Sequence, residues 1–495
     1  MIKTVVDNLE PSMLWKRFYE ISLVPRPSKG EEQIRAYLRN FASARNLRMK
    51  EDKVGNIVIY VEPTAGYEKS PVVVLQSHVD MVCEKNKGKE HNFDVDPLKL
   101  IRSGEWIKAD GTTLGADNGI GVAAALAVAS DYSIIHGPLE LLFTVDEETG
   151  LTGVNSLEPG YIKGKYLLNL DTEEDGVFYV GCAGGVDTVG TFNIEWKKSN
   201  KNYIPFLLSV GGLKGGHSGI NIADKRASAI KLLGCLLNEL SEITFEVGYL
   251  SGGSKRNAIA REAEALLYID PNDETKIREL INEFSLSAIL EYQKTDSDIK
   301  ISFEPRELEN NPRVFENKFY KRILNAILGL PHGPISMSAD IEGLVETSTN
   351  LATLTIDEDK FIIGTCQRSS IESAKKNIAA SVKSVLELAG GEVVFSDGYP
   401  GWQPNLDSKL LKIAKKSFTD TFDKIPEMKA VHAGLECGIL SDKFPDLEMI
   451  SFGPTIEGAH SPDERVNIPT VEKFYNLLLS ILTDIADLEN EKNRR

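Results

Sequence analysis

The sequence predicts an α/β protein with a doubly wound, mostly parallel sheet and an inserted α+β domain. The first third of the chain alternates short β-branched runs with amphipathic or Ala-rich segments, as parallel sheets with crossover helices do. From about residue 185 longer strands dominate, and after a Gly- and Pro-rich break at 398–405 helix and strand alternate again. The chain has 495 residues, more than one hydrophobic core usually supports. We therefore expect one domain from 1–184 and 400–495, and a second from 185–399.

The elements of the first domain follow from the spacing of apolar residues. Apolar positions three and four apart, or an Ala-rich run, predict helices at 14–24, 31–44 and 119–130, and further helices at 407–418 and 469–488. Short apolar runs of the kind buried on both faces of a sheet predict strands at 71–79, 139–145, 165–170 and 446–453.

The inserted domain has a different pattern. Longer segments with partial alternation predict strands at 187–196, 202–213, 263–269, 300–307, 349–370 and 390–398, and a clear helix is expected at 226–243. Such a pattern is typical of an antiparallel sheet with helices on one face.

Composition excludes several classes of protein. The net charge of −17 argues against nucleic acid as a partner, because phosphate binding relies on clustered Lys and Arg. No apolar run approaches the ~20 residues of a membrane span, and the N-terminus does not resemble a signal peptide. The five cysteines are scattered without a CxxC pair, which favours reduced thiols in a cytoplasmic protein.

His78 and Asp80 stand at the end of the predicted strand 71–79. Their side chains share one side of an extended chain, because side chains alternate with period two. An acid placed in this way can hydrogen-bond the second ring nitrogen of a metal-binding histidine. The alternative for an isolated HxD is a polar strand end capped by a turn.

Glu147 and Glu148 follow the predicted strand 139–145, with Asp146 beside them. A nearby cation would make three gathered carboxylates tolerable. Neighbours on an extended chain point in different directions, so one Glu can bind a metal while the other serves as general base for hydrolysis. The alternative is a solvated helix face.

Four further residues complete the candidate set. Asp117 precedes a helix and Asp171 follows a strand, so each also has a simpler explanation, as an N-cap or a turn. His460 can join the others only if the C-terminal segment folds back onto the first domain. His217 lies among glycines in LKGGHSGINI, which indicates backbone crowded against a ligand. Imidazole and carboxylate ligands suit zinc and similar divalent ions.

With these motifs the sequence resembles the zinc metallopeptidases of the glutamate carboxypeptidase and aminoacylase type, and among them the aminoacyl-histidine dipeptidases, also called Xaa-His or cytosol non-specific dipeptidases. The resemblance rests on SHVDMVCEKNKG, DGTTLGADNGIG, DEETGLTG, GGHSG, NAIARE, GLVETSTNLA, CQRSS, HAGLECG and EGAHSPDERV, which span the whole chain. One departure is Ala260 in NAIARE, where the family has Pro; it affects loop stiffness more than chemistry.

The resemblance implies a catalytic domain with two metal ions bridged by Asp117. One ion would be held by His78 and Asp171, and the other by Glu148 and His460. Glu147 would be the general base, Asp80 would orient His78, and the Asp117–Asn118 peptide bond would be cis.

The resemblance also makes the inserted domain a lid. His217 would stabilise the oxyanion, Asn257 would orient the scissile group, and Arg368 would bind the substrate carboxylate. Backbone amides near Gly434 would line the same end. Relatives often pair through this domain, so we expect a homodimer.

The function implied is hydrolysis of Xaa-His and related unblocked dipeptides by a water bridging two divalent ions, most simply zinc, with manganese or cobalt as alternatives. Deacylation of N-acyl amino acids at the same site remains open, because the sequence shows no site for a free substrate amine. An inactive scaffold is disfavoured because every motif residue is present, and a phosphoesterase usually needs more His and basic groups.

Overall fold

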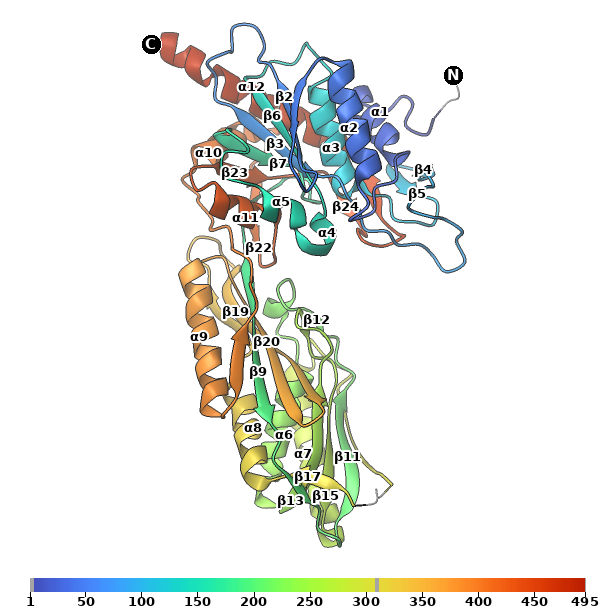
Figure 1. Cartoon of the computed structure of the whole chain (residues 1–495), viewed down its shortest axis with the longest axis vertical. Coiled ribbons are helices and arrows are strands. Elements are labelled where there is room, and N and C mark those ends of the chain that lie inside the picture. Colours follow the sequence, from blue (N-terminus) through green and yellow to red (C-terminus); the bar gives the residue numbers. More distant parts are fainter. Residues whose placement is uncertain (1–3, 308–310, 495) are drawn as a thin grey trace. The chain divides into compact units, whose positions relative to one another are not determined.

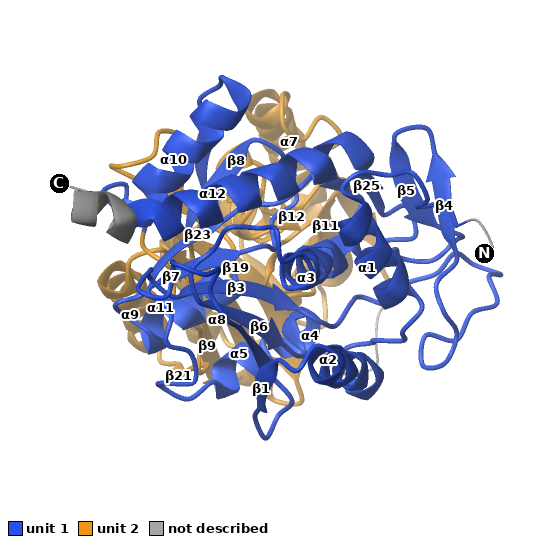
Figure 2. Cartoon of the chain, turned by 90° about the horizontal axis from the view of Figure 1, so that it is seen from above, with its two compact units in different colours: residues 1–181, 404–430, 435–495 blue, residues 182–403, 431–434 orange. Residues whose placement is uncertain are grey.

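The computed structural model describes residues 4–307 and 311–494, and the chain divides into two compact units. Unit 1 consists of residues 1–181, 404–430 and 435–495, and unit 2 of residues 182–403 and 431–434 (Figure 2). The sequence analysis gave no indication that the short segment 431–434 returns to unit 2. Each unit is described separately below.

Unit 1 is built on an eight-stranded mixed sheet (Figure 1). In spatial order its strands are β1 (Arg48–Glu51), β2 (Ile57–Val61), β6 (Leu139–Thr144), β3 (Val73–His78), β7 (Tyr166–Asn169), β23 (Glu448–Ser451), β8 (Val177–Cys182) and β22 (Glu427–Val431). The pairs β6–β3, β3–β7 and β7–β23 are parallel, and the pairings β1–β2, β2–β6 and β23–β8 are antiparallel. The predicted α/β class is confirmed, and the central strands β6, β3, β7 and β23 pair in parallel.

Helices surround this sheet. They are α1 (Ser12–Ser22), α2 (Glu32–Ala44), α3 (Ala116–Val128), α4 (Glu147–Gly150), α5 (Thr152–Ser156), α10 (Lys409–Phe422), α11 (Glu436–Lys443) and α12 (Ile468–Arg494). The Ala-rich α3 is buried almost all round and packs against both α1 and β3, as a helix without a polar face must. Helix α1 ends two residues before the predicted position 24, because Pro25 disfavours helical backbone at the residue before it.

The parallel strands place their carboxyl ends at one edge of the sheet. The chain leaving β3, β6 and β7 there carries three of the predicted site segments. A second, four-stranded sheet was not predicted; it consists of β24 (Ile456–Glu457), β25 (Arg465–Asn467), β5 (Trp106–Ala109) and β4 (Leu100–Ser103). Because β24 and β25 pair antiparallel, they fix both ends of the loop that carries His460.

Unit 2 is built on an antiparallel sheet. Its path is β16 (Lys300–Pro305), β11 (Ile204–Gly211), β15 (Ala263–Ile269), β13 (Phe245–Gly252), β19 (Val345–Asp357), β20 (Lys360–Ser369), β9 (Gly184–Asn193) and β21 (Glu392–Phe395), with β18 (Gly333–Met337) beside β19. Two short antiparallel strand pairs accompany it. They are β10 (Trp196–Lys198) with β17 (Arg313–Phe315), and β12 (Gly216–His217) with β14 (Ala258–Ile259).

The helices of unit 2 share one hydrophobic core with the sheet. They are α6 (Ala229–Glu239), α7 (Glu274–Tyr292), α8 (Asn317–Gly329) and α9 (Glu372–Leu388), with 3₁₀ turns η1 (Ile222–Asp224), η2 (Leu240–Glu242) and η3 (Pro271–Asp273). Leu233 of α6 and Leu386 of α9 belong to the same buried cluster as Leu208 and Val210 of β11. The expected antiparallel sheet with helices on one face is therefore present.

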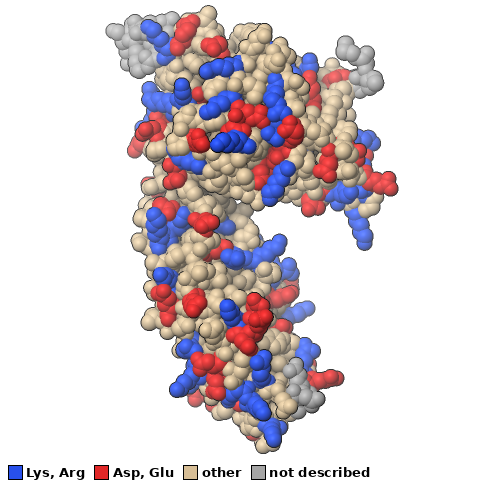
Figure 3. All heavy atoms as spheres, in the orientation of Figure 1, with Lys and Arg blue, Asp and Glu red and all other residues tan. Residues whose placement is uncertain are grey.

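The visible surface carries charges of both signs. Figure 3 shows Lys and Arg interspersed with Asp and Glu over the face it presents. Within the described residues, no helix combines the length and apolarity needed to cross a membrane.

Candidate metal centre

His78 brings two carboxylates together at the end of β3. Its imidazole is buried, and Nε2 lies 3.0 Å from Asp117 Oδ1 and 3.2 Å from Asp171 Oδ1. Asp171 follows β7, so parallel pairing of β3 and β7 accounts for its position. Asp117 lies at the start of α3 in non-helical backbone, and its peptide bond to Asn118 is cis.

His460 faces the other oxygen of Asp117. His460 Nε2 lies 3.2 Å from Asp117 Oδ2 and 3.1 Å from Glu148 Oε2. The two oxygens of Asp117 thus face two different imidazoles. Ligand atoms of His78, Asp117 and Asp171 gather within 4.8 Å of one another, and those of Asp117, Glu148 and His460 do the same. These five residues outline two adjacent positions that share Asp117.

The electrostatics of this cluster favour a positive charge. Among the described residues, its carboxylates form ion pairs with the imidazoles of His78 and His460 and with no Lys or Arg. Hydrogen bonds to Asp117 and Glu148 raise the pKa of His460 to about 11. Burial alone would lower the pKa of His78, yet Asp171 and Asp117 raise it well above its usual value.

The residues present fit two divalent cations. Glu148 Oε1 is buried and has no hydrogen-bond partner within the described part of the chain, although an unpaired buried carboxylate oxygen is costly. Imidazole nitrogens and carboxylate oxygens are the donor set of catalytic zinc and related ions. A cation beside Glu148 would supply the missing partner.

Glu147 and Glu148 do not lie on extended chain, so the expectation from the strand pattern was wrong. Strand β6 ends at Thr144, and the two glutamates form the first turn of the short helix α4. Glu148 Oε2 lies 3.1 Å from His460 Nε2, and ligand atoms of Glu147 and Glu148 also lie within 4.8 Å of one another and of His78. Burial, reinforced by the nearby Asp171, raises the pKa of Glu147 well above its ordinary value.

Asp80 explains why the chain turns into a helix there. Its oxygens accept the backbone N–H groups of Glu147 at 3.1 Å and Glu148 at 3.2 Å. Its Oδ1 also lies 3.3 Å from His78 Nδ1, and its Oδ2 accepts a hydrogen bond from Ser28 Oγ at 2.8 Å. Asp80 therefore orients His78 and the glutamate turn together, a second contact that sequence reasoning missed.

Two other buried glutamates near the cluster were also missed. Glu31 accepts the N–H of Asp146 at 3.1 Å, where the chain adopts a left-handed φ of 49°. Glu436 accepts from Gln76 at 2.5 Å and Thr144 at 3.0 Å, and burial raises its pKa to about 7. Glu436 stands in the HAGLECG motif, so a signal was present, but that motif suggested backbone amides only.

In unit 2, hydrogen bonds fix the tautomer of His217. Its Nδ1 accepts the backbone N–H groups of Gly219 and Ile220, each at 3.1 Å. The ring proton of a neutral imidazole must then be on Nε2. Burial, with the charge of Arg368, lowers the pKa of His217 to about 4. His217 is therefore a neutral side chain whose Nε2–H has no hydrogen-bond acceptor among the described residues.

Arg368 is a buried cation, only 5% exposed. Its Nη1 donates to Tyr399 Oη at 2.6 Å and its Nε to Ser218 Oγ at 3.3 Å. Both partners are neutral, and no described carboxylate forms an ion pair with Arg368. A buried guanidinium without a counter-charge favours an anionic ligand.

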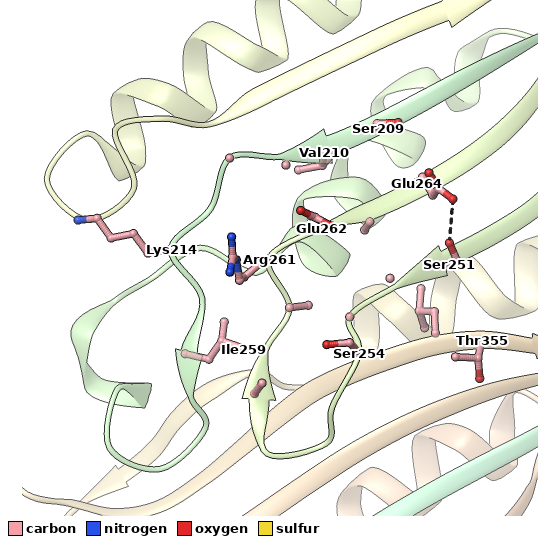
Figure 4. A pocket seen from close by; sticks show the side chains of 18 of the residues that line it. Ser209, Val210, Lys214, Ser251, Ser254, Ile259, Arg261, Glu262, Glu264 and Thr355 are labelled. Atoms are coloured by element: carbon pink, nitrogen blue, oxygen red, sulfur yellow. Dashed lines mark hydrogen bonds between the residues drawn. The ribbon is translucent and has the colours of Figure 1, made fainter. Parts of the chain in front are cut away.

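Asn257 and Gly434 lie close to these residues. The backbone N–H of Ser218 donates to the carbonyl of Asn257 at 2.8 Å, and Gly434 packs so tightly on Tyr399 that a Cβ would lie 2.8 Å from its ring. Asn257 and His217 are among the residues that line a cavity of about 1190 Å³ in unit 2. Arg261, Glu262 and the hydrogen-bonded Ser251 and Glu264 line the same cavity (Figure 4).

Comparisons with known proteins show the family of this chain. The sequence model of peptidase family M20/M25/M40 matches residues 74–484. The chain is 37% identical to the cytosol non-specific dipeptidase of Escherichia coli (strain K12), over 97% of this chain and 99% of the relative. The chain belongs to this peptidase family.

Solved structures extend the likeness to the whole fold. The aminoacylhistidine dipeptidase from Vibrio alginolyticus superposes with a TM-score of 0.91 and 40% identity, over 97% of this chain and 98% of that one. A tripeptidase from Staphylococcus aureus, 18% identical with a TM-score of 0.56 over 97% and 99% of the two chains, shares the fold.

Proposed function

We propose that this chain is a dinuclear metal-dependent dipeptidase that hydrolyses Xaa-His and related unblocked dipeptides. The observation that carries the proposal is Asp117, whose two oxygens face the imidazoles of His78 and His460 at 3.0 and 3.2 Å. Two relatives that match nearly the whole chain, at 37% and 40% identity, are dipeptidases by name. The alternative, deacylation of N-acyl amino acids, would use the same residues of unit 1.

In this proposal His78 and Asp171 hold one cation, Glu148 and His460 hold the other, and Asp117 contacts both. When bound, such cations supply the Lewis acidity that lowers the pKa of a water molecule and polarises a carbonyl. Glu147 takes the proton of the attacking water and later delivers it to the leaving amine. Asp80 orients His78 and the Glu147–Glu148 turn through the contacts described above.

Unit 2 would bind the substrate. His217 donates its Nε2–H to the carbonyl oxygen as negative charge develops there, and the neutral ring matches this role. Arg368 pairs with the free C-terminal carboxylate of the dipeptide, for which its fork of donors is well suited. Asn257 and the amide of Gly434 orient the peptide group. On this assignment unit 1 is the catalytic domain and unit 2 is the lid.

Three further properties belong to the same proposal. Zinc is the metal that best suits the nitrogen and oxygen ligands, with manganese or cobalt as substitutes. A cytoplasmic location is supported by the cytosolic relative and by the scatter of the cysteines without a CxxC pair. A homodimer through unit 2 is supported by Ile335 and Met337, which are 46% and 50% exposed on β18.

A substrate panel tests the function. Carnosine, Gly-His, Leu-Gly and N-acetyl amino acids are offered to the protein with and without added metal. We expect metal-dependent hydrolysis of the unblocked dipeptides and little turnover of the acylated compounds. Preference for the N-acetyl amino acids would assign the chain to the deacylases instead.

A further inference from the structure

Glu464 accepts hydrogen bonds from the backbone of the loop that carries Asp117. Its side chain is only 2% exposed. Oε2 accepts the N–H groups of Leu114 at 2.7 Å and Gly115 at 2.8 Å. Oε1 accepts those of Ala116 at 2.8 Å and Asp117 at 3.3 Å. One carboxylate thus satisfies four consecutive N–H donors that end at the proposed bridging ligand.

Arg26 holds the same loop from another side. It is 2% exposed and donates to the carbonyl oxygens of Gly115, Asp80 and Val79, the last two at 2.8 and 3.1 Å. A Cβ at Gly119 would lie 2.8 Å from its Nη2, and one at Gly115 would overlap that atom. Gly115 and Gly119 of TLGADNGIG therefore allow the chain to pass close to this guanidinium.

These contacts connect three separate ligand segments. Arg26 ties the loop of Asp117 to the chain directly after His78. Glu464 ties the same loop to the segment of His460, which lies four residues earlier. The hydrogen bonds described for both side chains go to backbone groups, so both act through the backbone that presents the ligands.

We propose that Glu464, together with Arg26, is a positioning residue that presets Asp117 between the two cation positions. The inference rests on the proposed dinuclear centre. The carboxylate of Glu464 and the guanidinium of Arg26 hold the loop so that both oxygens of Asp117 are in place before metal binds. Metal binding then requires less ordering of the loop. Loss of Glu464 should lower the affinity for both ions, because Asp117 contacts both.

Glu140 provides a matched control. It is also a buried glutamate of unit 1, at 3% exposure, and its Oε2 accepts two backbone N–H groups, those of Lys163 at 2.7 Å and Gly164 at 3.0 Å. It has no contact with a proposed ligand. Glu464→Gln and Glu140→Gln therefore remove the same kind of interaction from two places.

The experiment measures metal binding to the full-length, metal-stripped variants by competition with a chelator, using Zn²⁺, and by the visible absorption of bound Co²⁺. We expect Glu464→Gln to weaken Zn²⁺ binding at least ~10-fold, as loss of residues that orient metal ligands does, and to change the Co²⁺ spectrum. Glu140→Gln should lower the Tm of the stripped protein but keep the affinity and spectrum of the parent.

Parental affinity and spectrum in Glu464→Gln, whatever its Tm, would overturn the inference and leave Glu464 a purely structural residue. If Glu464→Gln does not fold, Arg26→Lys gives the same test, because one ammonium cannot reach three carbonyls; it too should weaken Zn²⁺ binding. A parent that binds no metal would refute the proposed function itself, whereas two ions bound equally by parent and variant would refute only this inference.

Discussion

At the scale of single residues, the proposed mechanism assigns proton transfer to Glu147 and metal binding to Glu148. Glu147 approaches His78 but belongs to neither group of ligand atoms that shares Asp117. Glu147→Gln keeps the shape and removes the base, so we expect kcat to fall at least ~100-fold with metal content unchanged. The check is steady-state kinetics beside metal analysis of the same preparation. Near-parental turnover would mean that another group takes the proton.

Arg368 should determine recognition of the substrate carboxylate. Arg368→Met removes the buried cation, so we expect KM for Gly-His to rise at least ~10-fold, as loss of a charge-assisted contact does. The amidated dipeptide should already be a poor substrate of the parent. Arg256→Met is the control, because Arg256 is half exposed and pairs with Asp187 at the surface of unit 2. Equal rates on free and amidated dipeptides would exclude this role for Arg368.

At the scale of elements, the turn that holds His217 depends on the returning segment 431–434. Gly219 lies directly against the carbonyl of His432, and a Cβ at Gly219 would overlap that oxygen. Gly219→Ala should push the turn and the segment apart. Small displacements of catalytic groups are costly, so we expect kcat to fall ~10-fold or more without loss of metal.

Gly329→Ala is the control for that change. It also lies in unit 2, and its added Cβ would meet only Val385 at an ordinary 3.7 Å. Kinetics and metal content are measured for both variants. If Gly219→Ala and Gly329→Ala behave alike, the packing of the turn on His432 has no part in catalysis.

The sequence predicted the helices and strands better than it predicted the contacts between residues that are far apart in the chain. His78, Glu147 and Glu148 stood out because acids and imidazoles at the ends of buried strands have no packing explanation. Asp117 and Asp171 each had a simpler explanation, and His460 could join only if the C-terminal segment folded back. The resemblance assigned all three. Glu464 stands in the EGAHSPDERV motif, but its role could not be predicted, because the amides that bond to it lie about 350 positions earlier in the chain.

The same limit explains the wrong expectation at Glu147. A strand pattern predicts where the strand ends but not what the chain does next. Here the acceptor for the two amides is Asp80, 67 and 68 positions away. The return of 431–434 to unit 2 is likewise a long-range feature that periodicity does not record.

At the scale of the whole molecule, stability should depend on pH through buried neutral histidines. Burial lowers the pKa of His332 to about 4, whereas an unfolded histidine has a pKa of ~6.5. Between these values the unfolded chain binds more protons, so the contribution of His332 to the free energy of unfolding is lost as pH falls.

His332→Gln isolates this contribution. Between pH 7 and pH 5, the free energy of unfolding of the parent should fall by ~2 kcal/mol more than that of the variant. Urea unfolding at the two pH values measures it, and other titrating groups cancel because both proteins contain them. A pH-independent difference would show that His332 keeps its ordinary pKa in the folded protein.

The most direct test of the central claim is a metal titration of the stripped protein during hydrolysis of Gly-His. Five candidate ligands form two positions that share Asp117. We therefore expect activity to be absent without metal and to rise with Zn²⁺ until two ions are bound per chain. Full activity in the stripped protein, or no hydrolysis of the dipeptide at any Zn²⁺ content, would contradict the account.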